Sequence, residues 1–381
     1  MVESDSVRRR HDDTVTTVDD GDRSRWGPSW ASRRGTARHP EWEHRLVLRG
    51  VGRGLGPDLS VCMHTQTYIL AHIHKATCSA AENLDKQDVC ERIVMSALRY
   101  HNIAMMENGY VCLLGKFHNV LYVAAKLCFD WNLNNNEIVS RLLNDIFYCE
   151  KTFERILVGA IFGTRVTHFL SGWKSDFEDR EENLRALMYF LHHATVGRLE
   201  YRCASSLDKR RFIDVPMESY GQALPLRVAI QHGSPDILLI MLRYGASVES
   251  DKLAPSPLEM LLSKLSEYDA QPGQDQIVFP EHLLLCLKLV LRTVTTAFVK
   301  TPGHIAEQSG IFSVSIYEQY PTLVEQKLVP PERSGMSPPE LRHLCRCRIR
   351  ETLFENWALP HGIQKLQIPE SLRNYLDLLG D

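Results

Sequence analysis

The fold is decided by two adjacent segments, Leu224-Pro225-Leu226-Arg227-Val228-Ala229-Ile230-Gln231-His232-Gly233 and Ser234-Pro235-Asp236-Ile237-Leu238-Leu239-Ile240-Met241-Leu242-Arg243-Tyr244-Gly245-Ala246. Pro225 stands where a first helix begins, since proline at the first helical position loses no hydrogen bond. Ala229 is small enough for paired helices to approach. Gly233 turns the chain, and Gly245 ends a second, aliphatic helix in the left-handed conformation. The pattern predicts two short, paired helices.

A second unit of the same kind begins at Ser256-Pro257-Leu258-Glu259-Met260-Leu261-Leu262, 32 residues after the first when counted between prolines. Together the two units resemble ankyrin repeats, which have a period of about 33 residues. In that repeat frame, Leu224 and Arg227 replace the usual Thr and His. The residues that match the frame are Pro225, Leu226, Ala229, Gly233, Leu242, Gly245, Pro257 and Leu258.

Helical periodicity continues on both sides of these units. We predict helices at Val61–Ala81, Val89–Tyr100, Asn119–Phe129, Asn136–Tyr148, Thr152–Phe162, Val166–Gly172, Glu181–Ala194 and Glu281–Phe298. Asp85 and Asp88 are available as helix caps, and an insert lies around residues 271–275. Because one repeat leaves an apolar face uncovered, at least three must stack. We therefore expect an all-α fold, with a degenerate ankyrin-like helical stack over residues 59–328.

Residues 1–58 have a different composition and are expected to form a disordered tail and linker. Arg, Asp, Ser and Gly dominate there, aliphatic residues are few, and apolar periodicity is missing. The glycines of Gly50–Gly56 alternate and do not fit Gly-x-Gly-x-x-Gly, so a phosphate-binding loop is not predicted.

The last segment, residues 329–381, changes pattern again. Ser337-Pro338-Pro339-Glu340 reads as a capping box with Ser337 as the N-cap and Pro338 at the first helical position. Apolar residues then recur at helical spacing, and arginines occupy the other faces; the apolar set is Leu341, Leu344, Cys345, Ile349 and Leu353. A second helix is predicted at Pro369–Leu379, with Gly380 as its stop. Cys345, in the middle of the apolar face, is expected to be buried by packing.

This C-terminal segment resembles a SOCS box. The half of that module that binds elongin asks for Leu, then Cys four residues on, then a small aliphatic residue four further, as at Leu341, Cys345 and Ile349. The half that selects the cullin asks for Leu-Pro-aliphatic-Pro, and Leu366-Gln367-Ile368-Pro369 stands in its place. Two positions depart from the family pattern: Glu340 precedes the leucine, and Gln367 replaces the first proline.

A helical stack followed by a SOCS box resembles the ankyrin repeat and SOCS box family, which supplies substrate receptors of cullin-RING ubiquitin ligases. The resemblance implies that elongin C, with elongin B alongside, contacts Leu341, Leu344, Cys345 and Ile349. It implies that Leu366, Ile368 and Pro369 help to recruit cullin-5 with its RING-box protein, while the stack holds an unknown protein substrate. The alternative is a helical-repeat scaffold outside the ubiquitin system, whose C-terminal hairpin caps the stack.

Composition narrows the class of protein. The chain has 381 residues and a formal net charge of -3, so charge alone favours neither nucleic acid nor membrane as a partner. Ten cysteines are present without a Cys-x-x-Cys, the usage of a reducing compartment, and the first residues lack the apolar core of a secretion signal. We expect a cytoplasmic or nuclear protein.

No catalytic constellation is apparent, so we predict a non-enzymatic protein without a cofactor. The motifs sought and not found are Gly-x-Ser-x-Gly, the Walker loop, His-Glu-x-x-His and Cys/His pairs at zinc spacing. His72 and His74 are two residues apart, which places them on different helix faces, and no metal site is predicted. His192 and His193 suit the end of a helix, as cationic or hydrogen-bonding residues.

Overall fold

The computed structural model describes residues 85–112, 118–163, 177, 179–203, 209–248, 255–269, 278–295, 298–302 and 311–381, all within one compact unit. Four predictions lie outside these residues: the 1–58 tail, the helices Val61–Ala81 and Val166–Gly172, and the insert at 271–275. The described part is mostly helical, which confirms the predicted fold class.

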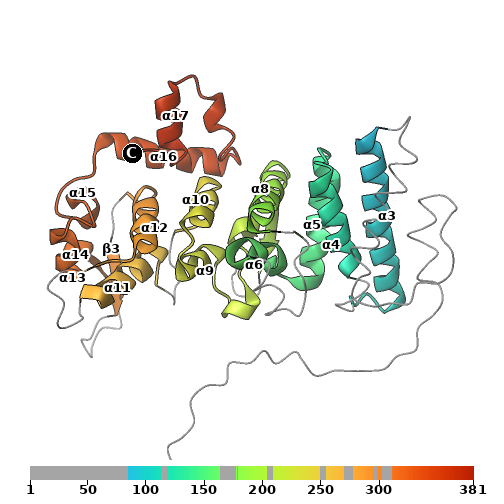
Figure 1. Ribbon diagram of the computed structural model, residues 1–381, viewed down its shortest axis with the longest axis horizontal. Coiled ribbons are helices and arrows are strands. Elements are labelled where there is room, and N and C mark those ends of the chain that lie inside the picture. Colours follow the sequence, from blue (N-terminus) through green and yellow to red (C-terminus); the bar gives the residue numbers. More distant parts are fainter. Residues whose placement is uncertain are drawn as a thin grey trace, which may run out of the picture. The chain divides into compact units, whose positions relative to one another are not determined.

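Long helices form the first half of the stack (Figure 1). They are α3 (Lys86–Glu107), α4 (Asn119–Asp130), α5 (Asn136–Glu150), α6 (Glu154–Phe162) and α8 (Arg180–Val196). Each of α3, α4 and α5 packs on the other two, α5 packs on α8, and α8 on α6. Side chains cap three of these helices, because Asp85, Asn135 and Asp179 each accept hydrogen bonds from backbone N–H groups of the first turn.

The ankyrin-like units follow as shorter helices. They are α9 (Pro225–His232), α10 (Pro235–Arg243), α11 (Pro257–Asp269) and α12 (Glu281–Leu291). Gly233 and Gly245 have φ of 71° and 84°, as expected for left-handed ends of α9 and α10. Helix α9 packs on α6, α10 and α11, and α12 packs on α10 and α11, so the repeat continues the stack of longer helices.

Two small antiparallel sheets interrupt the helices. Strand β1 (Glu200–Arg202) pairs with β2 (Lys209–Arg211), and β3 (Phe298–Pro302) pairs with β4 (Ile311–Ser315). The helix predicted at Glu281–Phe298 is therefore too long, because α12 ends at Leu291 and Phe298 begins β3. A run of β-branched residues, Thr293-Val294-Thr295-Thr296, follows α12 and disfavours its continuation.

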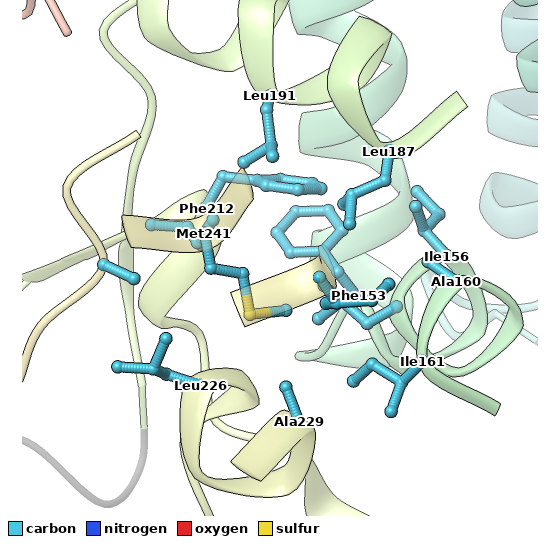
Figure 2. Close-up of a cluster of buried hydrophobic side chains, with 14 of the residues drawn as sticks. Phe153, Ile156, Ala160, Ile161, Leu187, Leu191, Phe212, Leu226, Ala229 and Met241 are labelled. Atoms are coloured by element: carbon cyan, nitrogen blue, oxygen red, sulfur yellow. The ribbon is translucent and has the colours of Figure 1, made fainter. Parts of the chain in front are cut away.

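The hydrophobic core runs between these elements. Its central part is drawn in Figure 2, where Phe153 and Phe212 lie among aliphatic side chains of α6, α8, α9 and α10. The two rings are 4.3 Å apart between centroids, and both are fully buried. Phe212 is the first residue of a short 3-10 helix, η1 (Phe212–Asp214), and a second one, η2 (Glu218–Tyr220), follows it. Longer helices and ankyrin-like units thus share one core.

The C-terminal residues form short helices. They are α13 (Ile316–Gln319), α14 (Pro321–Glu325), α15 (Pro331–Ser334), α16 (Leu341–Glu355), the 3-10 helix η3 (Ile363–Lys365) and α17 (Glu370–Leu376). The segment 329–335, which joins the stack to the last helices, contains α15 with Arg333 and Ser334 buried. Among the described helices, none has the length and apolarity that crossing a membrane requires.

Candidate functional site

Helix α16 begins three residues later than the sequence suggested. Its N-cap is Glu340, whose side chain makes no capping hydrogen bond, so the predicted capping box is wrong. The reason lies in the two prolines, because a residue that precedes proline is pushed toward extended conformations. The Glu340 carboxylate instead accepts a hydrogen bond from Arg333 of α15 at 2.8 Å.

The orientation of α16 is the main feature of this site. Its first apolar residues face outward: Leu341 is 76% exposed and Ile349 is 39% exposed, and Leu344 and Cys345 are also exposed. Leu353 and Phe354, near the end of the helix, are half-buried and pack on a small core of Leu359, Ile363 and Leu376. The residues buried against the rest of the chain are His343, Arg346 and Arg350. This is the reverse of an ordinary amphipathic helix, and the expectation that Cys345 is buried is wrong within this chain.

Hydrogen bonds explain how polar side chains can be buried here. The Arg350 guanidinium donates to the carbonyl oxygens of Leu242 at 2.5 Å and Leu376 at 2.8 Å. His343 Nε2 donates to the Val294 carbonyl at 2.7 Å, and its Nδ1 accepts from Arg346 at 2.9 Å. These carbonyls lie at or just beyond the C-terminal ends of α10, α12 and α17, where helices leave acceptors unsatisfied. The buried face of α16 therefore completes the ends of other helices.

Electrostatics follow from this burial. Desolvation lowers the pKa of Arg350 to about 10, which still leaves it cationic at neutral pH. Burial also lowers the pKa of His343, which agrees with a neutral ring that accepts a hydrogen bond from an arginine. Asp377, buried beyond α17, forms a two-pronged ion pair with Arg243 of α10, at 2.9 and 2.6 Å.

Arg211 of β2 holds the C-terminal end of α16 against the stack. Its guanidinium lies 3.6 Å from the ring centre of Phe354 and 3.7 Å from that of Trp357, and it donates to the Phe354 carbonyl at 2.7 Å. Figure 1 shows α16 passing close to α10 and α12, with α17 beside it. Contacts on its inner face thereby fix the position of α16, and Leu341, Leu344, Cys345 and Ile349 stay exposed.

The segment that would select a cullin lies between α16 and α17. Leu366 and Ile368 are half-buried against a small core of Leu359, Ile363 and Leu376. Gln367 and Pro369 are exposed. Helix α17 ends at Leu376, and Leu378, with φ of 65°, takes the left-handed position. The stop predicted at Gly380 is therefore displaced by two residues.

The structure also shows where the repeat frame and the predicted helix-end histidines lie. The repeat-frame residues gather on α9, α10 and α11, with the frame prolines at their first positions. His192 and His193 lie in the last turns of α8, where His193 is buried and burial lowers its pKa to about 4. His193 hydrogen-bonds to Asn136 of α5 at 2.8 Å, and its role at the helix end stays a prediction.

Sequence reasoning missed the inverted burial of α16 and a four-residue histidine and cysteine cluster, His101, Cys112, His118 and Cys149. The only sequence signal for the first was the number of arginines on α16. The cluster left no signal in the sequence, since its members are 11, 6 and 31 residues apart along the chain.

Comparison with known proteins agrees with this architecture. Residues 337–377 match the SOCS box family. The chain is 32% identical over 180 residues to ankyrin repeat and SOCS box protein 17 of Mus musculus, covering 46% of this chain and 57% of the relative. It is 30% identical over 157 residues to the Homo sapiens protein of the same name, covering 40% of this chain and 49% of the relative.

The chain thus spans about half the length of the curated relatives it matches. No solved structure matches it. The match to the SOCS box covers α16, η3 and α17. Residues 337–377 are therefore a SOCS box, and the chain is homologous to the ankyrin repeat and SOCS box proteins.

Proposed function

We propose that this chain is the substrate-receptor subunit of a cullin-RING ubiquitin ligase. In this proposal Leu341, Leu344, Cys345 and Ile349 bind elongin C, with elongin B alongside, and Leu366, Ile368 and Pro369 help to recruit cullin-5. The helical stack holds a protein substrate. The chain makes no bond itself; it raises the concentration of the substrate near a ubiquitin-charged enzyme.

The single observation that carries the proposal is the outward-facing apolar row of α16. Leu341, Cys345 and Ile349 are spaced four residues apart, which suits a helix that inserts one face into a groove of a partner. The row is exposed, and the residues buried on the opposite face of the helix are His343, Arg346 and Arg350.

The alternative, a scaffold whose C-terminal hairpin serves only as a cap, accounts for less. Burial of Arg350 and the contacts of Arg211 with the end of α16 would suit a cap as well. A cap has no need, however, of an exposed leucine at the start of its main helix, because exposed apolar surface favours aggregation. The exposed row favours a docking helix.

The elongin contact is tested with Leu341→Ala/Cys345→Ala in the full chain. Both side chains are exposed, so the stack should stay folded while elongin recovery in an affinity purification falls. Loss of a central anchor typically costs about 2 kcal/mol or more, which is roughly thirtyfold in affinity. Arg348→Ala is the matched control, since Arg348 is exposed on the same helix but outside the row. Equal recovery of elongins B and C with the double variant would remove these residues as anchors.

The cullin choice is tested at Gln367. Leu366 already has ψ of 132°, which is compatible with a following proline, so Gln367→Pro restores the usual family pattern without changing the residue before it. We expect recovery of cullin-5 to rise with Gln367→Pro and fall with Pro369→Ala, while elongin recovery stays constant. If cullin-2 is recovered in place of cullin-5 from the unaltered chain, the assignment to cullin-5 fails and the elongin contact stands.

A further inference from the structure

Four potential metal ligands meet at the opposite end of the described stack from the SOCS box. They are His101 in α3, Cys112 after α3, His118 at the start of α4 and Cys149 near the end of α5. One ligand atom from each lies within 4.8 Å of the other three. Three nitrogen–sulfur distances are short: 3.4 Å from His101 Nε2 to Cys112 Sγ, 3.4 Å from His101 Nε2 to Cys149 Sγ, and 3.5 Å from His118 Nδ1 to Cys112 Sγ.

These distances match the edges of a tetrahedral zinc site. With Zn–S bonds of about 2.3 Å and Zn–N bonds of about 2.0–2.1 Å, tetrahedral geometry separates sulfur from nitrogen by roughly 3.5 Å. A set of two imidazoles and two thiolates suits Zn²⁺ in both softness and geometry. Two thiolates also balance the charge of the ion, so a bound Zn²⁺ would leave this half-buried site neutral.

The surroundings orient the ligands as zinc sites require. His118 Nε2, on the far side of the ring from Nδ1, hydrogen-bonds to the Glu150 carboxylate at 2.6 Å. The second oxygen of Glu150 accepts from the Tyr122 hydroxyl at 2.7 Å. Such carboxylate–histidine pairs fix the tautomer and orientation of a metal ligand. His101 presents Nε2 to the cluster.

Local backbone structure brings Cys112 back toward α3. Gly109 and Tyr110 have φ of 67° and 65°, and the Tyr110 amide donates to the Met105 carbonyl at 2.8 Å, so the chain reverses as α3 ends. A positive φ is rare for tyrosine, and Tyr110 is exposed, so its own side chain does not account for the conformation. The reversal places Cys112 beside His101, with Sγ 3.4 Å from Nε2 of the ring.

We propose that His101 Nε2, Cys112 Sγ, His118 Nδ1 and Cys149 Sγ form a structural Zn²⁺ site that ties α3, α4 and α5 together. All four positions are filled by protein ligands, which is typical of structural sites and leaves no position for a substrate. Binding requires loss of the protons from both thiols, so zinc uptake releases protons. The site is independent of the SOCS box and of the ligase proposal.

Two other arrangements of the same residues are possible chemically, and each gives a different result. Thiol–imidazole hydrogen bonds alone would leave the cluster without metal, and a Cys112–Cys149 disulfide would consume both sulfur ligands. Neither the hydrogen bonds nor the disulfide requires that two histidines and two cysteines all surround one centre. The convergence of four ligands from separate elements favours zinc.

The test is the metal content of the full chain, purified under reducing conditions and passed through gel filtration. We expect one zinc per chain by mass spectrometry, and X-ray absorption should show two sulfurs at about 2.3 Å and two nitrogens at about 2.0–2.1 Å. Co²⁺ exchanged into the site should give the absorption of a tetrahedral thiolate complex. These measurements need no variant, so they remain decisive if a substitution prevents folding.

The variant Cys112→Ser/Cys149→Ser should lose the zinc and the Co²⁺ spectrum, and the unaltered chain should unfold at a lower temperature after treatment with a zinc chelator. Cys345→Ser is the matched control, because Cys345 is exposed in α16 and outside the cluster. The proposal is overturned if the unaltered chain holds no zinc after incubation with one equivalent of Zn²⁺. It is also overturned if the double variant retains the same zinc, or if alkylation and mass spectrometry find a Cys112–Cys149 disulfide in its place.

Discussion

At the scale of single residues, Gly245 shows how one position serves both the repeat and the SOCS box. Its φ of 84° is left-handed, which favours glycine at the end of α10. A Cβ at this position would also lie 2.5 Å from Cδ2 of Phe354, which belongs to α16. Gly245 thus ends the repeat helix α10 and also leaves the space that Phe354 of α16 occupies.

We therefore expect Gly245→Ala to destabilise the chain more than a left-handed conformation alone would. Gly221→Ala is the matched control, because Gly221 has φ of 65° but open space around it. The control should lower the free energy of unfolding by about 1 kcal/mol, and Gly245→Ala by about 2–4 kcal/mol, since overpacking adds to the strain. Equal losses in chemical denaturation would show that Phe354 moves aside at no cost.

At the scale of elements, α16 inverts the usual rule that apolar faces pack inward. His343 and Arg350 donate to carbonyls at or just beyond the ends of α10, α12 and α17, and the third buried residue, Arg346, donates to His343. A leucine or isoleucine in place of Arg350 would leave the Leu376 carbonyl without this donor, while the Leu242 carbonyl would keep the Gly245 amide at 3.0 Å. Polar groups therefore make the inner contacts of the first turns of α16, and the row of Leu341, Cys345 and Ile349 stays exposed.

Arg350→Met tests this account of the inner face. Methionine keeps much of the volume but leaves the Leu376 carbonyl without its donor and removes one of the two donors to the Leu242 carbonyl. We expect a loss of about 2–4 kcal/mol in the free energy of unfolding, because unsatisfied buried acceptors are expensive. Arg348→Met, on the exposed side of α16, should change it by less than about 0.5 kcal/mol. If Arg350→Met unfolds with the same free energy as Arg348→Met, the role assigned to Arg350 is contradicted.

At the scale of the whole molecule, neutral histidines join the parts of the stack to one another. His193 of α8 meets Asn136 of α5, whose amide donates to His193 Nδ1 at 2.8 Å. His192 Nδ1 lies 2.8 Å from His361 Nε2 of the SOCS box. Burial lowers the pKa values of His192, His193 and His361.

These contacts predict loss of stability in mild acid. His193 takes up a proton near pH 4 when folded and near pH 6.5 when unfolded, so between these values the unfolded chain binds more protons. The free energy of unfolding should fall as the pH drops from about 6.5 toward 4, by about 2 kcal/mol at pH 5 from His193 alone. His193→Gln should flatten this dependence in chemical denaturation at pH 7 and pH 5. The groups nearest to His193 are Asn136, Tyr189 and His192, of which only His192 titrates in this range.

The sequence by itself determined the helical class, the ankyrin-like units at α9 to α12 and the SOCS box. These depend on local chemistry, such as proline at helix starts, glycine at left-handed ends and apolar residues at helical spacing. Helix ends were predicted less well: the capping box at Ser337 fails because two prolines follow it and Glu340 pairs with Arg333, and α17 ends before Gly380. Only the tertiary structure decided which face of α16 is buried and that His101, Cys112, His118 and Cys149 meet. Both depend on groups that are far apart in the chain and that no periodicity connects.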